Sequence, residues 1–174
     1  LPREQAKPSV FIDDNDVAWV FWRSIGQDGA GTEVYGRRFA VRNRTCTAQS
    51  DEFRVNSDIV GNQRDGVCCA LPNGDIMAAW VSEKNNVNTL FGRVFDQQGQ
   101  PLTEDFILHS NDERGLNLVS LAPHPQGVLA AWACTDLIGS PEGIQGSLIN
   151  FDENQKMSQK LFSAHDGASS LAFE

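Results

Sequence analysis

One pattern of strand-forming residues occurs three times along this chain. In each copy an apolar run ends in Trp, a second run has a Gly at its centre, and a third run closes in Asp. The spacings are 58 and 52 residues for the Trp, 56 and 54 for the Gly, and 54 and 54 for the Asp. The nine landmark residues are Trp22, Trp80, Trp132, Gly36, Gly92, Gly146, Asp58, Asp112 and Asp166. Three independent landmarks at one period indicate a repeat architecture.

Each copy also begins with a short apolar stretch that is followed by turn residues. In the middle copy this turn contains Asn73-Gly74, a strong short-range signal for a β-hairpin. Gly99-Gln100-Pro101 marks a second turn. The apolar runs are short, rich in β-branched and aromatic residues, and bounded by Gly, Asn, Asp or Pro. No segment of about ten residues or more has helical periodicity. The chain is therefore predicted to be all-β, with four antiparallel strands per copy.

A four-stranded unit of this size needs neighbours on both faces. The run Ala78-Ala79-Trp80 is apolar on both sides of its strand, as expected between two neighbouring units. We predict a β-propeller-like fold in which residues 1–174 form a single repeat domain. Its three blades span residues 6–58, 63–112 and 115–166, and residues 167–174 begin a further blade. The alternative is a β-trefoil, in which three copies close around a pseudo-threefold axis.

Propellers have about 4 to 8 blades. Three copies therefore predict that the chain self-associates or belongs to a longer polypeptide.

The middle copy, residues 63–112, has the most distinctive motifs. They are Trp80-Val81-Ser82, Gly92-Arg93-Val94-Phe95-Asp96 and Gly99-Gln100-Pro101. In these motifs the chain resembles tandem propeller-type repeats of large extracellular proteins. The first copy departs from the pattern at residues 41–51, and the third at residues 133–134 and 151–154. The resemblance implies a propeller fold and an extracellular or cell-surface location. It implies little about activity, because the function of such repeats is generally unassigned.

The formal net charge is −9 and the pI is about 4.7. This charge disfavours nucleic acid and anionic membrane surfaces as partners. No apolar run approaches the roughly 20 residues of a membrane-spanning helix, so membrane insertion is not expected. A protein or a glycan is the expected partner. Asn43 begins the sequon Asn43-Arg44-Thr45 and is a candidate for glycosylation.

The four cysteines match no zinc-binding pattern, and no cofactor is predicted. Cys68 and Cys69 are adjacent, and neighbours on a strand point to opposite faces, so a bond between them is not expected. Two disulfides or four free thiols both remain open for Cys46, Cys68, Cys69 and Cys134.

Five carboxylates are the candidate ligand-binding residues. Asp58, Asp112 and Asp166 occur once per copy and could together hold a cation. The alternative is that each Asp caps its own turn through bonds to backbone amides, which we favour because a residue present in every copy is usually structural. Glu83 and Asp136 follow the Trp of adjacent copies and are a candidate pair for glycoside hydrolysis.

No nucleophile with a base, metal cluster or marked carboxylate pair stands out as a catalytic site. The loops at residues 25–32, 83–88 and 135–142 vary most between copies, and recognition is commonly placed on such loops. We therefore predict a non-enzymatic binding or structural scaffold module. It would contact protein or carbohydrate through these loops and through the connections between copies. The alternatives are a lectin and a propeller-type glycoside hydrolase.

Overall fold

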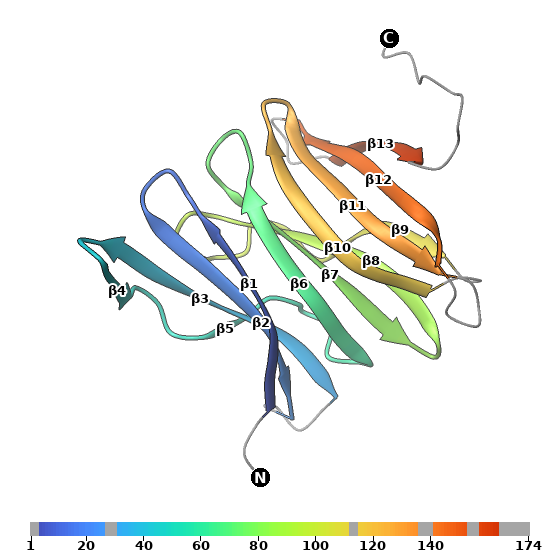
Figure 1. The fold of residues 1–174 in the computed structure, drawn as a ribbon, viewed down its shortest axis with the longest axis horizontal. Coiled ribbons are helices and arrows are strands. Elements are labelled where there is room, and N and C mark those ends of the chain that lie inside the picture. Colours follow the sequence, from blue (N-terminus) through green and yellow to red (C-terminus); the bar gives the residue numbers. More distant parts are fainter. Residues whose placement is uncertain (1–3, 27–30, 112–114, 136–140, 153–156, 164–174) are drawn as a thin grey trace.

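The computed structural model describes residues 4–26, 31–111, 115–135, 141–152 and 157–163. Within these ranges the chain forms thirteen β-strands and no helix, so the all-β prediction is confirmed. The strands are arranged in three antiparallel meanders, which we call units 1, 2 and 3 (Figure 1). In every unit the strands lie side by side in the order in which they occur in the sequence.

Unit 1 contains β1 (Glu4–Ile12), β2 (Val17–Ile25), β3 (Thr32–Arg42), β4 (Thr45–Ala48) and β5 (Phe53–Arg54). Unit 2 contains β6 (Asn62–Ala70), β7 (Ile76–Lys84), β8 (Val87–Phe95) and β9 (Phe106–Asn111). Unit 3 contains β10 (Gly115–His124), β11 (Gly127–Thr135), β12 (Pro141–Phe151) and β13 (Met157–Ser163).

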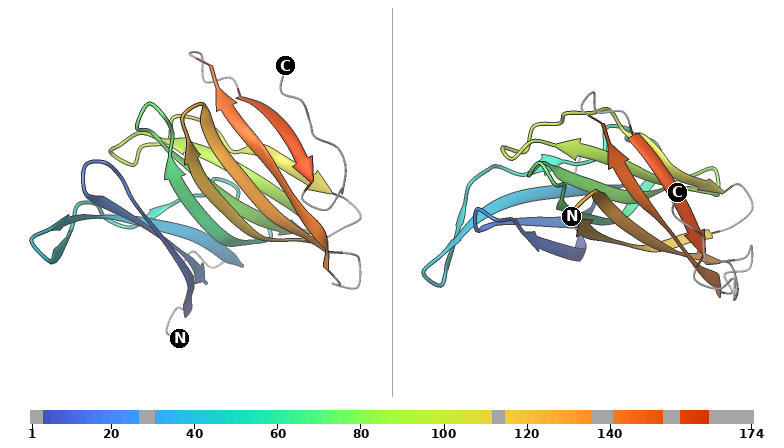
Figure 2. Two further views of the ribbon diagram at one scale, coloured as in Figure 1. Left: turned by 45° about the horizontal axis from the view of Figure 1, so that its top comes forward. Right: turned by 90° about the horizontal axis from the view of Figure 1, so that it is seen from above.

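The fourth strand of unit 1 differs from the prediction because it is interrupted. Both β4 and β5 pair with β3, and the residues between them leave the sheet. Units 1 and 2 are connected by one parallel pair, Thr32 with Asn62, and together form a nine-stranded sheet. Unit 3 is a separate four-stranded sheet. The two sheets do not close into a ring (Figure 2), so the number of blades stays a prediction.

The units pack face to face through alternate side chains of their second strands. On β7, Ile76, Ala78 and Trp80 pack against unit 1, whereas Met77, Ala79 and Val81 belong to the core shared with unit 3. All six are almost completely buried. Each large side chain buried in this way contributes roughly 1.5–3 kcal/mol. The second strand of unit 2 is therefore sandwiched between two neighbours, as its sequence predicted.

The Gly at the centre of each third strand makes room for an aromatic ring from the fourth strand. At Gly92, an added Cβ would lie 2.6 Å from the Phe106 ring. The same close approach occurs between Gly36 and Phe53, and between Gly146 and Phe162. This contact explains why one sequence landmark of the repeat is a glycine.

The acidic run at residues 13–16 forms a structural turn. The Asp13 carboxylate accepts hydrogen bonds from the amides of Asn15 (2.9 Å) and Val17 (3.0 Å), and from the indole of Trp19 (3.0 Å). Asp13 is buried and joins the β1–β2 turn to the core.

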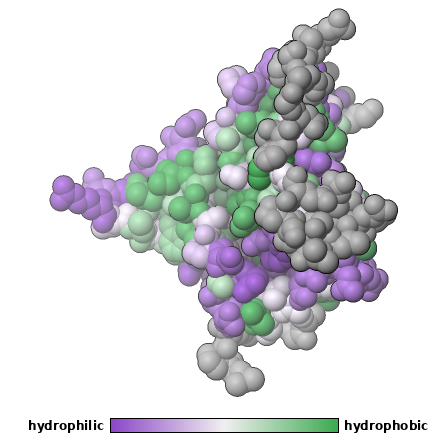
Figure 3. Space-filling model, turned by 45° about the vertical axis from the view of Figure 1, so that its right-hand side comes forward, coloured by the Kyte–Doolittle hydropathy of each residue, from purple (hydrophilic) through white to green (hydrophobic). Residues whose placement is uncertain are grey.

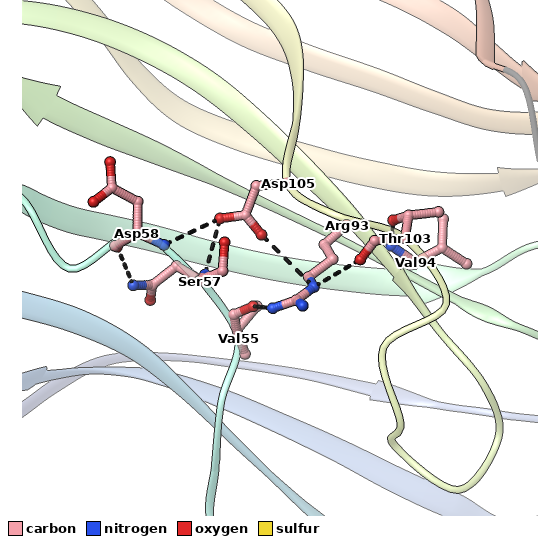
Figure 4. A network of polar contacts seen from close by, with 8 residues as sticks. Val55, Ser57, Asp58, Arg93, Val94, Thr103 and Asp105 are labelled. Atoms are coloured by element: carbon pink, nitrogen blue, oxygen red, sulfur yellow. Dashed lines mark hydrogen bonds and ion pairs between the residues drawn. The ribbon is translucent and has the colours of Figure 1, made fainter.

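A polar clamp joins unit 1 to unit 2 (Figure 4). Asp105, just before β9, accepts hydrogen bonds from the backbone amides of Ser57 (2.9 Å) and Asp58 (3.4 Å). Arg93 of β8 donates to the carbonyl of Val55 (3.2 Å) and forms an ion pair of 3.6 Å with Asp105. The clamp thus fixes the connection that leads from unit 1 to unit 2.

Candidate functional site

The first strand of each unit contains a β-bulge opposite the landmark Trp. In unit 1 the residue pairing shifts between Ala6 and Ser9, so that two residues lie opposite Trp22. The pairing shifts in the same way opposite Trp80 and Trp132. Bulges of this kind re-aim side chains and are common near binding sites.

The first residue of each bulge has a left-handed backbone. The φ angles are 54° at Lys7, 56° at Asp65 and 52° at Leu118. Non-glycine residues in this region cost roughly 1–2 kcal/mol each. The same conformation in three units, without a shared residue type, identifies the bulge as a feature of the repeat.

The three bulges lie at one cleft of about 640 Å³. Unit 1 contributes Lys7 and Arg23, and unit 2 contributes Arg64 and Asp65. Unit 3 contributes Asn117 and Leu118, together with a wall formed by residues 133–135 and 143–144. The lining of the cleft therefore contains residues of all three units, and a ligand bound there could contact all three units at once.

Arg64 organises the centre of this cleft. Its Nη1 donates to Asp65 Oδ2 (2.8 Å) and to Asn117 Oδ1 (2.9 Å). Its Nη2 donates to Asn88 Oδ1 (3.1 Å) and to the carbonyl of Leu116 (3.0 Å). Because these bonds fix the carboxylate of unit 2 and the amide of unit 3, the two groups are held in place before any ligand arrives.

The charge of the cleft is opposite to that of the whole chain. Three cationic side chains, Lys7, Arg23 and Arg64, line it beside one carboxylate, Asp65. Arg23 has a long contact of 3.9 Å with the exposed Glu4. The Lys7 side chain is exposed, and none of the described residues pairs with it. The site is suited to an anionic or hydroxyl-rich ligand.

Asp58 lies outside this cleft. Its Oδ1 accepts a hydrogen bond from the Val60 amide (2.9 Å), which is the turn-capping geometry that the sequence analysis favoured. Its Oδ2 lies 3.8 Å from Lys84 Nζ at the surface. Asp112 and Asp166 lie outside the described residues, so the predicted ring of carboxylates stays a prediction.

Glu83 lies near the end of β7, half-buried and paired with Asn62 across the sheet. Asp136, its proposed catalytic partner, lies outside the described residues. Asn43 is exposed in the turn between β3 and β4 and has a positive φ of 49°. The loop at 83–88 is a tight turn with positive φ at Asn85 and Asn86. Parts of the loops at 25–32 and 135–142 are not described.

None of the four cysteines forms a disulfide, which decides between the two alternatives left open by the sequence. Cys68 and Cys69 face opposite cores, as their adjacency predicted. Burial raises the pKa of Cys69 to about 12 and that of Cys68 further still. Cys46 is exposed. The thiols of Cys68 and Cys69 are therefore inert packing groups.

Trp80 and Trp132 are almost completely buried in the two cores. Trp22 differs: it is partly exposed, because no described residue outside unit 1 covers that side. Within the described residues no group of three His, Cys, Asp or Glu could hold a metal ion. In the same part of the chain, no helix is long and apolar enough to cross a membrane.

No protein-family model and no curated protein matches this sequence. The structure is similar to that of an endo-arabinase from Bacteroides thetaiotaomicron VPI-5482, with a TM-score of 0.51 and 15% sequence identity. The similarity covers 91% of this chain and 55% of the endo-arabinase chain, so this chain spans about half the length of that protein. At this identity the likeness concerns the fold.

Proposed function

We propose that this chain is a non-enzymatic carbohydrate-binding module, and that an acidic saccharide binds in the cleft at the three bulges. The observation that carries the proposal is the prearranged set of polar groups around Arg64. Proteins bind saccharides through groups that accept hydrogen bonds from sugar hydroxyls and groups that donate hydrogen bonds to them. A carboxylate next to an amide supplies an acceptor and a donor. The likeness in fold to an endo-arabinase, a carbohydrate-active enzyme, is compatible with this ligand class.

Each side chain of the cleft has a separate role in this proposal. Asp65 Oδ2 and Asn117 Oδ1 are occupied by Arg64, which leaves Asp65 Oδ1 to accept and Asn117 Nδ2 to donate. Lys7 and Arg23 supply the positive charge for a sugar carboxylate. Leu118, whose side chain is 69% exposed, offers an apolar surface to a sugar ring.

We propose binding without catalysis because the described lining of the cleft contains only one carboxylate, Asp65. Hydrolysis of a glycosidic bond normally requires two carboxyl groups on either side of it. Asp65 is bound to the Arg64 guanidinium at 2.8 Å.

Binding should be measured with a glycan array that contains neutral arabinan and polygalacturonate, followed by calorimetry on the saccharides retained. We expect Lys7→Glu to weaken binding of the acidic saccharide about fivefold to tenfold, because it reverses one charge at the cleft. Lys84→Glu changes an exposed lysine outside the cleft and should leave the affinity unchanged. Lys7→Glu should also leave the fold intact, since Lys7 is exposed.

Two outcomes would overturn the proposal. One is the absence of any bound saccharide, or an affinity that Lys7→Glu does not alter. The other is release of reducing sugar ends that is lost in Glu83→Gln, which would favour the glycoside hydrolase instead.

A further inference from the structure

Both ends of the stack of units present a face that no described residue of another unit covers. Unit 1 packs on unit 2 through one side of its sheet, and its other side has no neighbour within the described structure. We call this side the front face; the pairing register places Val10, Ile12, Val20, Trp22 and Phe39 on it. Val10 is 66% exposed and Ile12 53% exposed. Figure 3 shows hydrophobic side chains gathered into a continuous surface area with a hydrophilic border.

The front face of unit 1 has the same arrangement of residues as the face by which unit 2 packs on unit 1. That face of unit 2 is covered by unit 1, and it contributes Trp80, Phe91 and Phe95 to the core. Because the strand registers correspond, each residue of unit 2 has a counterpart in unit 1. The pairs are Trp80 and Trp22, Phe91 and Tyr35, Arg93 and Arg37, and Phe95 and Phe39.

The correspondence extends to individual hydrogen bonds. Arg93 Nε donates to the carbonyl of Thr103 at 3.0 Å, and Arg37 Nε donates to the carbonyl of Ser50 at 3.0 Å. The Arg93 guanidinium lies 5.6 Å from the Phe95 ring centre, and that of Arg37 lies 5.5 Å from the Phe39 ring centre. Arg93 uses its Nη1 to bind the neighbouring unit at Val55. Arg37 is thus held in the pose that binds a neighbour.

The side of unit 3 that points away from unit 2 has the complementary design, and within the described residues no other unit covers it. We call it the back face. Its residues correspond to those by which unit 2 packs on unit 3. In unit 2 these are Met77, Ala79, Leu90, Gly92, Val94 and Phe106, and in unit 3 they are Leu129, Ala131, Ile144, Gly146, Leu148 and Phe162. Leu129 is 38% exposed and Ile144 40% exposed, whereas Met77 and Leu90 are fully buried.

We propose that the front face of this chain binds the back face of a second copy, and that two copies close head to tail into a ring of six units. Each copy has one face of each kind, so a twofold axis satisfies all four faces with two identical contacts. Six units lie within the range of about 4 to 8 found in closed propellers.

A second copy is the occupant that the chain itself supplies. Within one copy, the face of unit 2 that carries Trp80, Phe91 and Phe95 packs on unit 1, and the front face repeats that arrangement. The back face repeats the face by which unit 2 packs on unit 3. The front and back faces of two copies are therefore matched in the same way as adjoining units of one copy.

The first test is the solution mass by light scattering on a size-exclusion column. We expect a single species with twice the chain mass of 19.1 kDa. A monomer would overturn the proposal and indicate that other segments of a longer polypeptide cover the two faces. An open series of larger assemblies would overturn it as well, because the ring would then not close.

Three substitutions test the pairing of faces: Val10→Asp on the front face, Leu129→Asp on the back face, and Leu161→Asp as the control. Leu161 is 48% exposed and lies on the opposite side of β13 from Phe162. We expect each of the first two variants to be a monomer and the control to remain a dimer. Circular dichroism and thermal unfolding establish that each variant is folded.

Mixing the two monomeric variants distinguishes head-to-tail pairing from self-pairing. In a mixed dimer one contact joins the intact front face of Leu129→Asp to the intact back face of Val10→Asp. We therefore expect heterodimers to form on mixing. If Val10→Asp is a monomer while Leu129→Asp remains a dimer, the copies pair front to front and the proposed ring is wrong.

Discussion

At the scale of single residues, His109 connects unit 2 to the core of unit 3. Its ring lies against the indole of Trp132, with 5.2 Å between the ring centres, and is half-buried. Burial lowers the pKa of His109 below its usual range, because the charged imidazolium is poorly solvated there. The folded protein therefore favours the neutral ring.

This lowered pKa predicts a loss of stability in mild acid. Below the ordinary histidine pKa of about 6.5, the unfolded chain binds a proton that the folded chain does not. The free energy of unfolding should therefore fall as the pH decreases from about 7 through this window. His109→Gln should reduce that fall, as measured by urea unfolding at several pH values between about 7.5 and 5.5.

His124→Gln is the control for this prediction. His124 is the exposed last residue of β10, and its Nδ1 accepts a hydrogen bond from the Gln126 amide in the turn that follows. His124→Gln should show the same decrease in the free energy of unfolding with falling pH as the unsubstituted protein. If His109→Gln also keeps the whole loss, His109 is not its source.

At the scale of elements, the bulges show what the strands add beyond the repeat pattern. Leu118 has a φ of 52° although it is neither Gly nor Asn, and its side chain is 69% exposed. Little packing offsets the strain at this position. A glycine adopts such a backbone without steric cost.

Leu118→Gly should therefore stabilise the protein, or at least not destabilise it. The relief of about 1–2 kcal/mol of strain exceeds the entropic cost of a glycine, about 0.5–1 kcal/mol. Leu161→Gly, at an exposed position of β13 without positive φ, should instead lose about 1 kcal/mol. Denaturant unfolding of the two variants measures the difference. A similar loss in both would show that the bulge at Leu118 is unstrained.

The sequence predicts the strands well and the bulges not at all. Trp80 and Gly92 are predictable landmarks because core packing and the ring of Phe106 restrict those positions to few residue types. Lys7, Asp65 and Leu118 share only a backbone conformation, which leaves no common residue in the sequence. The cleft could therefore not be located from the sequence. Asp58 was a landmark for the same reason as Trp80 and Gly92, since a turn cap is also restricted to a few residue types.

At the scale of the whole molecule, the two contacts between units are held differently. Between units 1 and 2, Arg93 and Asp105 form the clamp of Figure 4, and their side chains are 12% and 11% exposed. The corresponding positions of unit 3 are Ser147 and Leu161, which form no such clamp. There, Gln159 donates to the carbonyl of Leu108 at 3.0 Å. In a stack of repeats, the contacts between neighbours determine cooperativity, so the clamp should couple unit 1 to the remainder.

Removing the clamp carboxylate should uncouple unit 1 from units 2 and 3. Asp105→Ala leaves the Ser57 and Asp58 amides without their acceptor and Arg93 without its counter-ion, at a cost of about 2–4 kcal/mol. We expect hydrogen exchange to increase most in β5 and the connection to β6, with β10–β12 unchanged. Glu104→Ala, at the exposed neighbouring position, should leave the exchange pattern as it was. A uniform increase across all three units would mean that the stack unfolds as one body, and that the clamp contributes stability without setting the boundary between units.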